Sequence, residues 1–258
     1  YMSDAVRSNL GISNFGVGQS FYGATNVNII NVYFLTNEPE PEPEPEPELG
    51  PPETTFIKTN GDTINIQING ELISDDYTDQ VNKEDIQEVI IGSAVTTIGN
   101  NAFQQSSLET ITIPNSVTRI NQYAFNQCQS LQTIIIPDSV TTIGRGNFIK
   151  CYNLQSVTLS NNLTRIDNYL FQNCTSLTSI IIPNSVTHID VYAFQGSALQ
   201  SITIPDSVTS TSSGIFYECT SLESAVIGNG LISIASSIFL GCTSLNSVTI
   251  GNSVTNIV

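Results

Sequence analysis

From residue 86 onward, apolar residues recur along the chain with a fixed period. Seven leucines mark this period, and they are Leu108, Leu131, Leu154, Leu177, Leu199, Leu222 and Leu245. Successive leucines are 23, 23, 23, 22, 23 and 23 residues apart. Each opens a phrase in which apolar residues alternate with Ser, Thr or Gln, from LETITI to LNSVTI. Such alternation predicts a short strand, and the fixed period predicts a solenoid of stacked coils.

Three further sets of apolar residues recur at fixed positions in the repeats, and we call each set a column. Ile or Val lies three residues after most leucines, and Ile or Leu lies five after. A phenylalanine column follows, and its members are Phe103, Phe125, Phe148, Phe171, Phe194, Phe216 and Phe239. Because side chains alternate along a strand, we expect these columns to point inward, with the phenylalanines filling the convex side of the core. No unit buries its apolar face alone, so stacking must stabilise the fold.

The phrases Ile113-Pro114-Asn115-Ser116-Val117-Thr118 and Ala124-Phe125-Asn126-Gln127-Cys128 resemble the BspA-like (treponemal type) leucine-rich repeat. The resemblance covers about residues 86–258. It implies a curved leucine-rich-repeat solenoid of about 23-residue repeats, with a short parallel β-sheet on the concave face. It also implies a surface protein of a bacterium, protist or virus, of a kind that often binds host or matrix proteins.

We predict four parts along the chain. Residues 1–37 form a β-rich anchor segment, residues 38–53 a Glu-Pro stalk or linker, residues 54–91 an N-terminal cap with the first strand, and residues 92–258 the solenoid. The first segment ends in a β-branched run that predicts an unpaired strand, with apolar members Val27, Ile29, Ile30, Val32, Tyr33, Phe34 and Leu35. In the cap, Thr63 to Ile68 alternate before Asn69-Gly70, which suggests a hairpin or edge strands.

Residues 38–48 alternate Glu and Pro without interruption. Proline fixes φ and the like charges repel, so a stiff polyproline II spacer of roughly 34 Å is one expectation. A disordered tether fits the same composition. In either form, the run separates the first segment from the repeats.

The net charge of −16 is unevenly placed. Residues 38–53 hold seven Glu and no base, whereas residues 108–258 hold seven acids and four bases. Acidity argues against nucleic-acid binding, because neutralising phosphates requires clustered Lys and Arg. No stretch approaches the length of a membrane-spanning helix, so we expect no membrane insertion.

The five cysteines, Cys128, Cys151, Cys174, Cys219 and Cys242, each precede a repeat leucine by three residues. Coils lie about 4.8 Å apart, which is long for bonded Cβ atoms, so we expect buried free thiols. No close Cys pair suggests zinc. Asp75, Asp76 and Asp79 lack the spacing of a calcium loop, and a solvated acidic cap is the simpler interpretation. We therefore expect no metal and no cofactor.

No catalytic motif is present, and the single histidine, His188, falls in a variable column of the repeat. We accordingly predict a non-enzymatic protein. One unit departs from the pattern: Thr211 replaces the Ile of its column, and Gly214-Ile215-Phe216 replaces the phrase Tyr-Ala-Phe. This substitution predicts a dent or loosened coil near residues 207–216. The last unit stops before its Phe, so we expect either that the chain continues or that the last coil meets a partner.

Outward positions of the concave strands lie two and four residues after each leucine. They are Thr110, Thr112, Thr133, Ile135, Ser156, Thr158, Ser179, Ile181, Ser201, Thr203, Ser224, Val226, Ser247 and Thr249. We call these residues the outer row. An exposed, uncharged row of this length predicts a binding face for a protein or glycoprotein, although Thr and Ile also simply suit strands.

The sequence thus predicts an extracellular recognition or adhesion module at a cell or virion surface. One alternative is a structural component of a virion or filament, anchored where residues 27–35 pair with another subunit. A remoter alternative is an ice-binding solenoid, since Thr-x-Thr rows occur. Against it, an ice-binding row must be strictly repeated, whereas this row contains Ile135, Ile181 and Val226.

Overall fold

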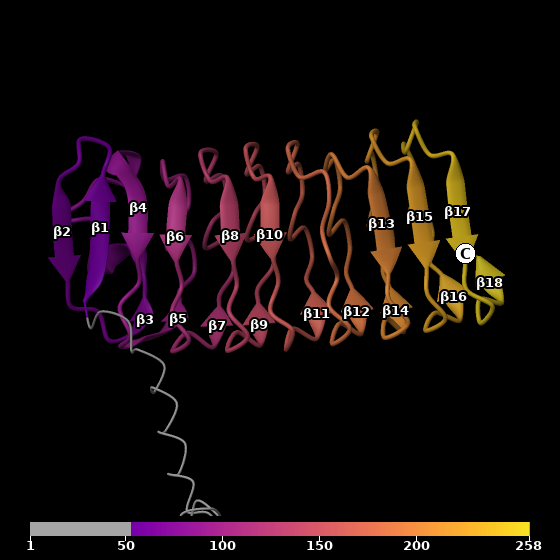
Figure 1. The fold of residues 1–258 in the computed structure, drawn as a ribbon, viewed down its shortest axis with the longest axis horizontal. Helices are drawn as coiled ribbons and strands as arrows, with labels where there is room; N and C mark the ends of the chain where they lie inside the picture. Colours follow the sequence, from indigo (N-terminus) through magenta and orange to yellow (C-terminus); the bar gives the residue numbers. More distant parts are fainter. Residues whose placement is uncertain (1–52, 258) are drawn as a thin grey trace, which may run out of the picture. The chain divides into compact units, whose positions relative to one another are not determined.

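The computed structural model describes residues 53–257, which form a β-solenoid. Figure 1 shows two rows of short strands running along it, and the repeat strands of one row are opposite in direction to those of the other. The first strand of the described residues runs against its own row. The predicted strand 27–35 and the Glu-Pro run lie outside the described residues. The predicted repeat solenoid is confirmed.

The first row contains three N-terminal strands and, after them, the strands that follow the repeat leucines. Its members are β1 (Thr54–Lys58), β2 (Thr63–Ile66), β4 (Ile86–Ile90), β6 (Thr110–Thr112), β8 (Thr133–Ile135), β10 (Ser156–Thr158), β13 (Ser201–Ile204), β15 (Ser224–Ile227) and β17 (Ser247–Ile250). They form sheets in the orders β2-β1-β4-β6, β8-β10 and β13-β15-β17. From β4 onward, the pairing within these sheets is parallel, as the sequence predicts.

A second row of strands runs along the solenoid, with one strand in each coil, and the sequence analysis did not predict it. Its members are β3 (Gly70–Leu72), β5 (Val95–Ile98), β7 (Arg119–Ile120), β9 (Thr142–Ile143), β11 (Arg165–Ile166), β12 (His188–Ile189), β14 (Ser210–Thr211), β16 (Ser233–Ile234) and β18 (Asn256–Ile257). Val117 and Ile120 of one such unit are both fully buried. The sequence signal for this row was therefore the Val-x-x-Ile spacing. In this unit, its Val points inward just before the short strand, and its Ile points inward at the end of the strand.

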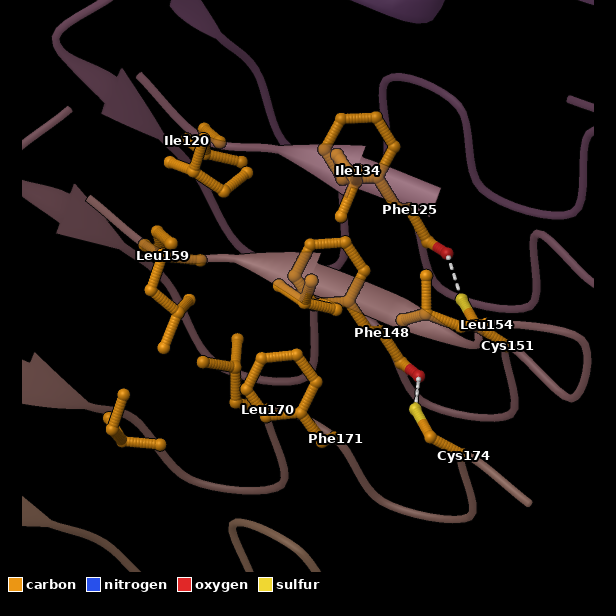
Figure 2. Close-up of a cluster of buried hydrophobic side chains, with 14 of the residues drawn as sticks. Ile120, Phe125, Ile134, Phe148, Cys151, Leu154, Leu159, Leu170, Phe171 and Cys174 are labelled. Atoms are coloured by element: carbon orange, nitrogen blue, oxygen red, sulfur yellow. Dashed lines mark hydrogen bonds between the residues drawn. The ribbon is translucent and has the colours of Figure 1, made fainter. Parts of the chain in front are cut away.

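Stacked phenylalanines run through the core between the rows. Phe125, Phe148 and Phe171 are fully buried, and their ring centroids lie 5.6 and 5.3 Å apart with nearly parallel planes (Figure 2). Because each ring covers the next, every coil completes the core of its neighbour. In the last described coil the inward columns are open instead: Val248 and Ile250 are 37% and 41% exposed.

An antiparallel pair, β1 and β2, lies at the N-terminal end of the first row. Its turn is closed by Lys58, whose N–H donates to the carbonyl of Asp62 at 2.9 Å, with Gly61 at φ +87°. The sequence pointed to Asn69-Gly70 as the turn, and that placement is wrong. Gly70 instead opens β3, which pairs in parallel with β5. Asn60-Gly61 and Asn69-Gly70 are both dipeptides that favour turns. Which of them forms the hairpin turn is therefore decided by the strands that pair with one another.

The aromatic stack continues into this N-terminal region. Phe56 lies 4.7 Å from Tyr77, and Tyr77 lies 5.8 Å from Phe103, measured between ring centroids. The buried Tyr77 hydroxyl donates to the carbonyl of Ala102. Two 3-10 helices, η1 (Ser74–Asp76) and η2 (Lys83–Asp85), complete the region.

Left-handed backbone conformations bracket many of the core phenylalanines. Tyr123 and Gln127, on either side of Phe125, have φ of +58° and +60°. In the next coil the position of Tyr123 is taken by Gly146, where a Cβ would lie 2.4 Å from the Tyr123 ring. Gly146 has a φ of +65°, close to that of Tyr123, so the ring that lies against it, and not the backbone conformation, favours glycine at this position.

Strand pairing breaks twice in each row: after β6 and β10 in the first row, and after β9 and β14 in the second. Residues 178–182, predicted as a strand, form none, and Ile180 there is only half-buried. In the second row, β14 pairs with β12 but not with β16 among the described residues. That break coincides with the predicted loosened coil, where Thr211 Oγ1 and Ser207 Oγ are buried without a hydrogen-bond partner. Thr in an Ile column thus places a polar atom where the fold supplies no acceptor or donor.

Candidate functional site

The first-row strands display the outer row as predicted. Thirteen of its fourteen members are exposed, and Ser224 is half-buried. Strand alternation produces this result, because the residues between them, such as Ile134 and Val157, point into the core and are 2% and 8% exposed. The sequence therefore located the exposed positions correctly, although exposure alone does not test binding.

Parallel pairing aligns the outer row in two columns. Ser201, Ser224 and Ser247 are register partners in one column, and Thr203, Val226 and Thr249 are partners in the other. β8 and β10 align Thr133 with Ser156 and Ile135 with Thr158 in the same way. Hydroxyl groups thus form one edge of the face, and β-branched side chains form the other.

Apolar side chains of the second column are exposed. Ile181 is 86% exposed, Ile135 is 68% exposed and Val226 is 42% exposed. They alternate with Thr112, Thr158, Thr203 and Thr249 along the solenoid. Ile181 lies in the interrupted segment 178–182, so it projects from irregular backbone rather than from a strand.

The outer row contains no charged residue. Acidic residues lie beside it in the first row of strands, whereas arginines lie in the second row. Three acids lie beside the outer row: Glu88 of β4 is the register partner of Thr110, and Glu109 and Glu223 immediately precede outer-row positions of β6 and β15. Two arginines, Arg119 and Arg165, begin second-row strands β7 and β11. Arg165 forms an ion pair with the buried carboxylate of Asp190. A partner docking on the outer row therefore meets uncharged side chains with acidic groups beside them.

The face extends further than the sequence analysis recognised. Thr55 and Ile57 of β1 pair with Ile90 and Glu88 of β4, whose own partners include Thr112 and Thr110. Thr55 and Ile57 are therefore N-terminal continuations of the two outer-row columns. The signal was the alternation within Thr54 to Lys58, where Thr54 and Phe56 are buried and their neighbours are not.

All five cysteines are free thiols, and four of them are buried. Burial raises the pKa of Cys128 to about 12 and that of Cys242, which is half-buried, to about 11. Burial also raises the pKa of Cys151, Cys174 and Cys219. Reactive or metal-binding cysteines need a stabilised thiolate, and this environment does the reverse.

The acidic cap residues are not gathered around a common point. Within residues 53–257, no group of three or more His, Cys, Asp or Glu side chains has the arrangement of a metal site. The Asp76 carboxylate accepts a hydrogen bond from the N–H of Ile73 at 2.7 Å, so it caps η1.

His188 is exposed, and its Nδ1 lies 2.7 Å from the Thr187 hydroxyl. None of the helices among residues 53–257 has the length and apolarity that a bilayer span requires.

Two shallow hollows lie outside the outer row. One of about 460 Å³ lies in the N-terminal region and is lined by Thr78, Val81, Asn82, Lys83, Glu84, Gln104 and Gln105. Burial lowers the pKa of Lys83 there. The other, about 360 Å³, lies at the break between β14 and β16 and is lined by residues such as Ser210, Thr211 and Ile232. Neither brings together groups that could form a nucleophile and its base.

Comparison with known proteins identifies the repeat. The profile of the BspA type leucine rich repeat region matches residues 52–178 and 143–258, with six copies. The structure is similar to a leucine rich repeat protein of T. pallidum, with a TM-score of 0.57 and 26% identity over 67% of this chain and 79% of that one. A leucine-rich repeat protein from Bacteroides ovatus is also 26% identical, over 80% of this chain and 69% of that one, with a TM-score of 0.42. A search of curated proteins found no match.

Proposed function

Because this chain belongs to the BspA type leucine-rich repeat family, we propose that it is a non-enzymatic recognition or adhesion module. It is displayed outside the cell or on a virion, and it binds a protein or glycoprotein through the outer row. The observation that carries this proposal is a face of exposed hydroxyl and β-branched side chains, repeated over seven coils without a charge. Leucine-rich repeat proteins generally bind other proteins, and solenoids provide extended faces for doing so.

Binding energy on this face should concentrate at the exposed aliphatic side chains. Ile135 and Ile181 offer the largest apolar contact, since they are 68% and 86% exposed. Burying one such side chain in an interface contributes about 1.5–3 kcal/mol. The surrounding Thr and Ser hydroxyls then provide the hydrogen-bonding rim.

Single substitutions test this face against the rest of the solenoid. Ile135→Glu and Ile181→Glu place a charge in the outer row, whereas Ile232→Glu changes an equally exposed isoleucine, 66% exposed, beside second-row strand β16. The probes are a monolayer of cultured animal cells and a dried extracellular-matrix coat. We expect both outer-row variants to lose at least about tenfold in attachment, with Ile232→Glu unchanged. If all three variants attach equally, the outer row is not the binding face. If the wild type does not attach, the protein is not an adhesion module.

We also propose, as a second role, that residues 27–35 attach the module to another subunit of a virion or filament. The support is the β-branched sequence of this segment and the Glu-Pro run that follows it. Deleting residues 1–37 should then abolish assembly or surface attachment while the solenoid retains its unfolding midpoint. A truncated protein that still assembles would contradict this role.

Ice binding has weaker support, because the outer row is interrupted at residues 178–182, and we expect no thermal hysteresis.

A further inference from the structure

The edge of β2 carries unused backbone hydrogen-bonding groups. β1 and β2 are antiparallel, with Phe56 opposite Ile64 and Thr55 opposite Asn65. In an antiparallel pair, hydrogen-bonded and non-hydrogen-bonded residue pairs alternate. Counting from the Lys58–Asp62 hydrogen bond, Ile64 is directed toward β1. The N–H and C=O groups of Thr63 and Asn65 therefore point away from β1, and within residues 53–257 no strand pairs with them.

This edge lacks the devices that normally prevent edge-to-edge pairing. Natural sheets protect their edges with proline, charge or bulges. β2 reads Thr-Ile-Asn-Ile and contains no proline and no charge. The one irregularity nearby lies between Ile57 and Lys58, where β1 pairs with β4 on the opposite side. An unprotected edge of this kind is a template for another strand.

We propose that β2 of one copy pairs antiparallel with β2 of a second copy, around a two-fold axis at Ile64. Thr63 of each chain then faces Asn65 of the other, and each of these two pairs exchanges both backbone hydrogen bonds. Ile64, which is half-buried in the single chain, meets its counterpart on the core side. The interface is isologous, because the same four residues supply both halves.

Charge and geometry favour a second copy of β2 as the strand that pairs with this edge. β2 is uncharged, so two copies do not repel along the strand. The nearest acid, Asp62, lies two residues from the axis, which places the two copies of it roughly 13 Å apart. Pairing would join the two β2-β1-β4-β6 sheets into one, with Thr55 and Ile57 of both chains on the same side as their outer rows. Two binding faces would thereby be linked, which raises avidity for a repeated or multivalent surface. The pairing itself does not depend on the proposed function.

Sedimentation of the full-length chain tests the pairing. The weight-average mass should rise toward twice that of the single chain between about 1 μM and about 1 mM, a range that covers the weak affinities of small interfaces. Asn65→Pro removes an N–H that has no partner among residues 53–257, and edge strands tolerate proline at such positions. We expect this variant to remain monomeric. Asn65→Ala is the matched control, because it loses the same side chain but keeps the N–H, and it should associate like the wild type.

A charge-exchange pair keeps the test independent of proline. Thr63→Lys combined with Asn65→Lys places like charges across the axis and should abolish association. Thr63→Asp combined with Asn65→Lys places opposite charges across it and should restore association. A wild type that stays monomeric at every concentration overturns the proposal, and so does association that survives in Asn65→Pro. Association lost on deleting residues 1–37, but kept in Asn65→Pro, would assign it to the N-terminal segment instead.

Discussion

The Sγ of Cys151 donates a hydrogen bond to the backbone carbonyl of Phe125, one coil earlier, across 3.2 Å (Figure 2). The same relationship joins Cys128 to Phe103, Cys174 to Phe148, Cys219 to Phe194 and Cys242 to Phe216. Each thiol is thus a second donor to a carbonyl next to the aromatic stack, because that carbonyl also accepts a backbone N–H of its own turn, as Phe125 does from Cys128 at 3.1 Å. The cysteine column is therefore a structural element of the stacking itself.

Removing this hydrogen bond should destabilise the solenoid. Cys151→Ala removes one of the two donors to the Phe125 carbonyl, which keeps the N–H of Cys128, and leaves a cavity where the buried thiol lay. We therefore expect a loss of about 1–3 kcal/mol in the free energy of unfolding. Urea denaturation measures this loss. Cys242→Ala is the matched control, because Cys242 makes the same bond but is only half-buried. Equal losses for both variants would mean that burial is not what makes the bond matter.

Alkaline pH should destabilise the fold through the buried thiols. Burial raises the pKa of Cys128 from 9.0 to about 12, so the folded chain keeps a proton that the unfolded chain releases. The stabilisation is complete below pH 9 and is lost as pH rises toward 12. Each such thiol lowers the free energy of unfolding by about 1.4 kcal/mol per pH unit in this window. Cys128→Ser should reduce the slope by that amount, and an unchanged slope would contradict the assignment.

The centre of the aromatic stack should tolerate truncation least. Phe171→Ala removes a fully buried ring that lies 5.3 Å from Phe148 and 5.5 Å from Phe194. We expect a cost of about 3–5 kcal/mol through the cavity it leaves. Phe239→Ala provides the comparison, since Phe239 is only partly buried and stacks on Phe216. Its thermal unfolding midpoint should fall by less, and an unchanged midpoint for Phe171→Ala would contradict the register.

One substitution should stabilise the protein. Thr211→Val replaces a buried hydroxyl that has no hydrogen-bond partner with a methyl group of similar size. We expect a gain of about 1–3 kcal/mol, because the cost of burying the unpaired oxygen disappears. Thr209→Val is the control: its exposed hydroxyl already donates to the Thr187 carbonyl at 3.4 Å. If the Thr211 variant shows no gain in urea denaturation, the hydroxyl is paired in solution.

The outer row was predictable because strand alternation depends on local geometry alone. Once Ile134 and Ile136 are inward, Thr133 and Ile135 must be outward, and their exposure follows. The extension of the face to Thr55 and Ile57 was not predictable in this way. It depends on β1 pairing with β4, a contact between residues far apart in the sequence that breaks the 23-residue period.

The period, the buried columns and the free cysteines follow from the order of residues alone, because each repeat supplies the same side chains to the same positions of a stack. Tertiary structure decides what depends on neighbouring coils. It turns the Val-x-x-Ile spacing into a second row of strands, holds Tyr123 and Gln127 in left-handed turns that their residue types do not favour, and selects Gly61 over Gly70 for the hairpin. It also interrupts the first row at residues 178–182 and exposes the edge of β2. These features have one physical cause: backbone hydrogen bonds between coils are formed by partners that about 23 residues of chain separate, and no local pattern specifies which of them will form.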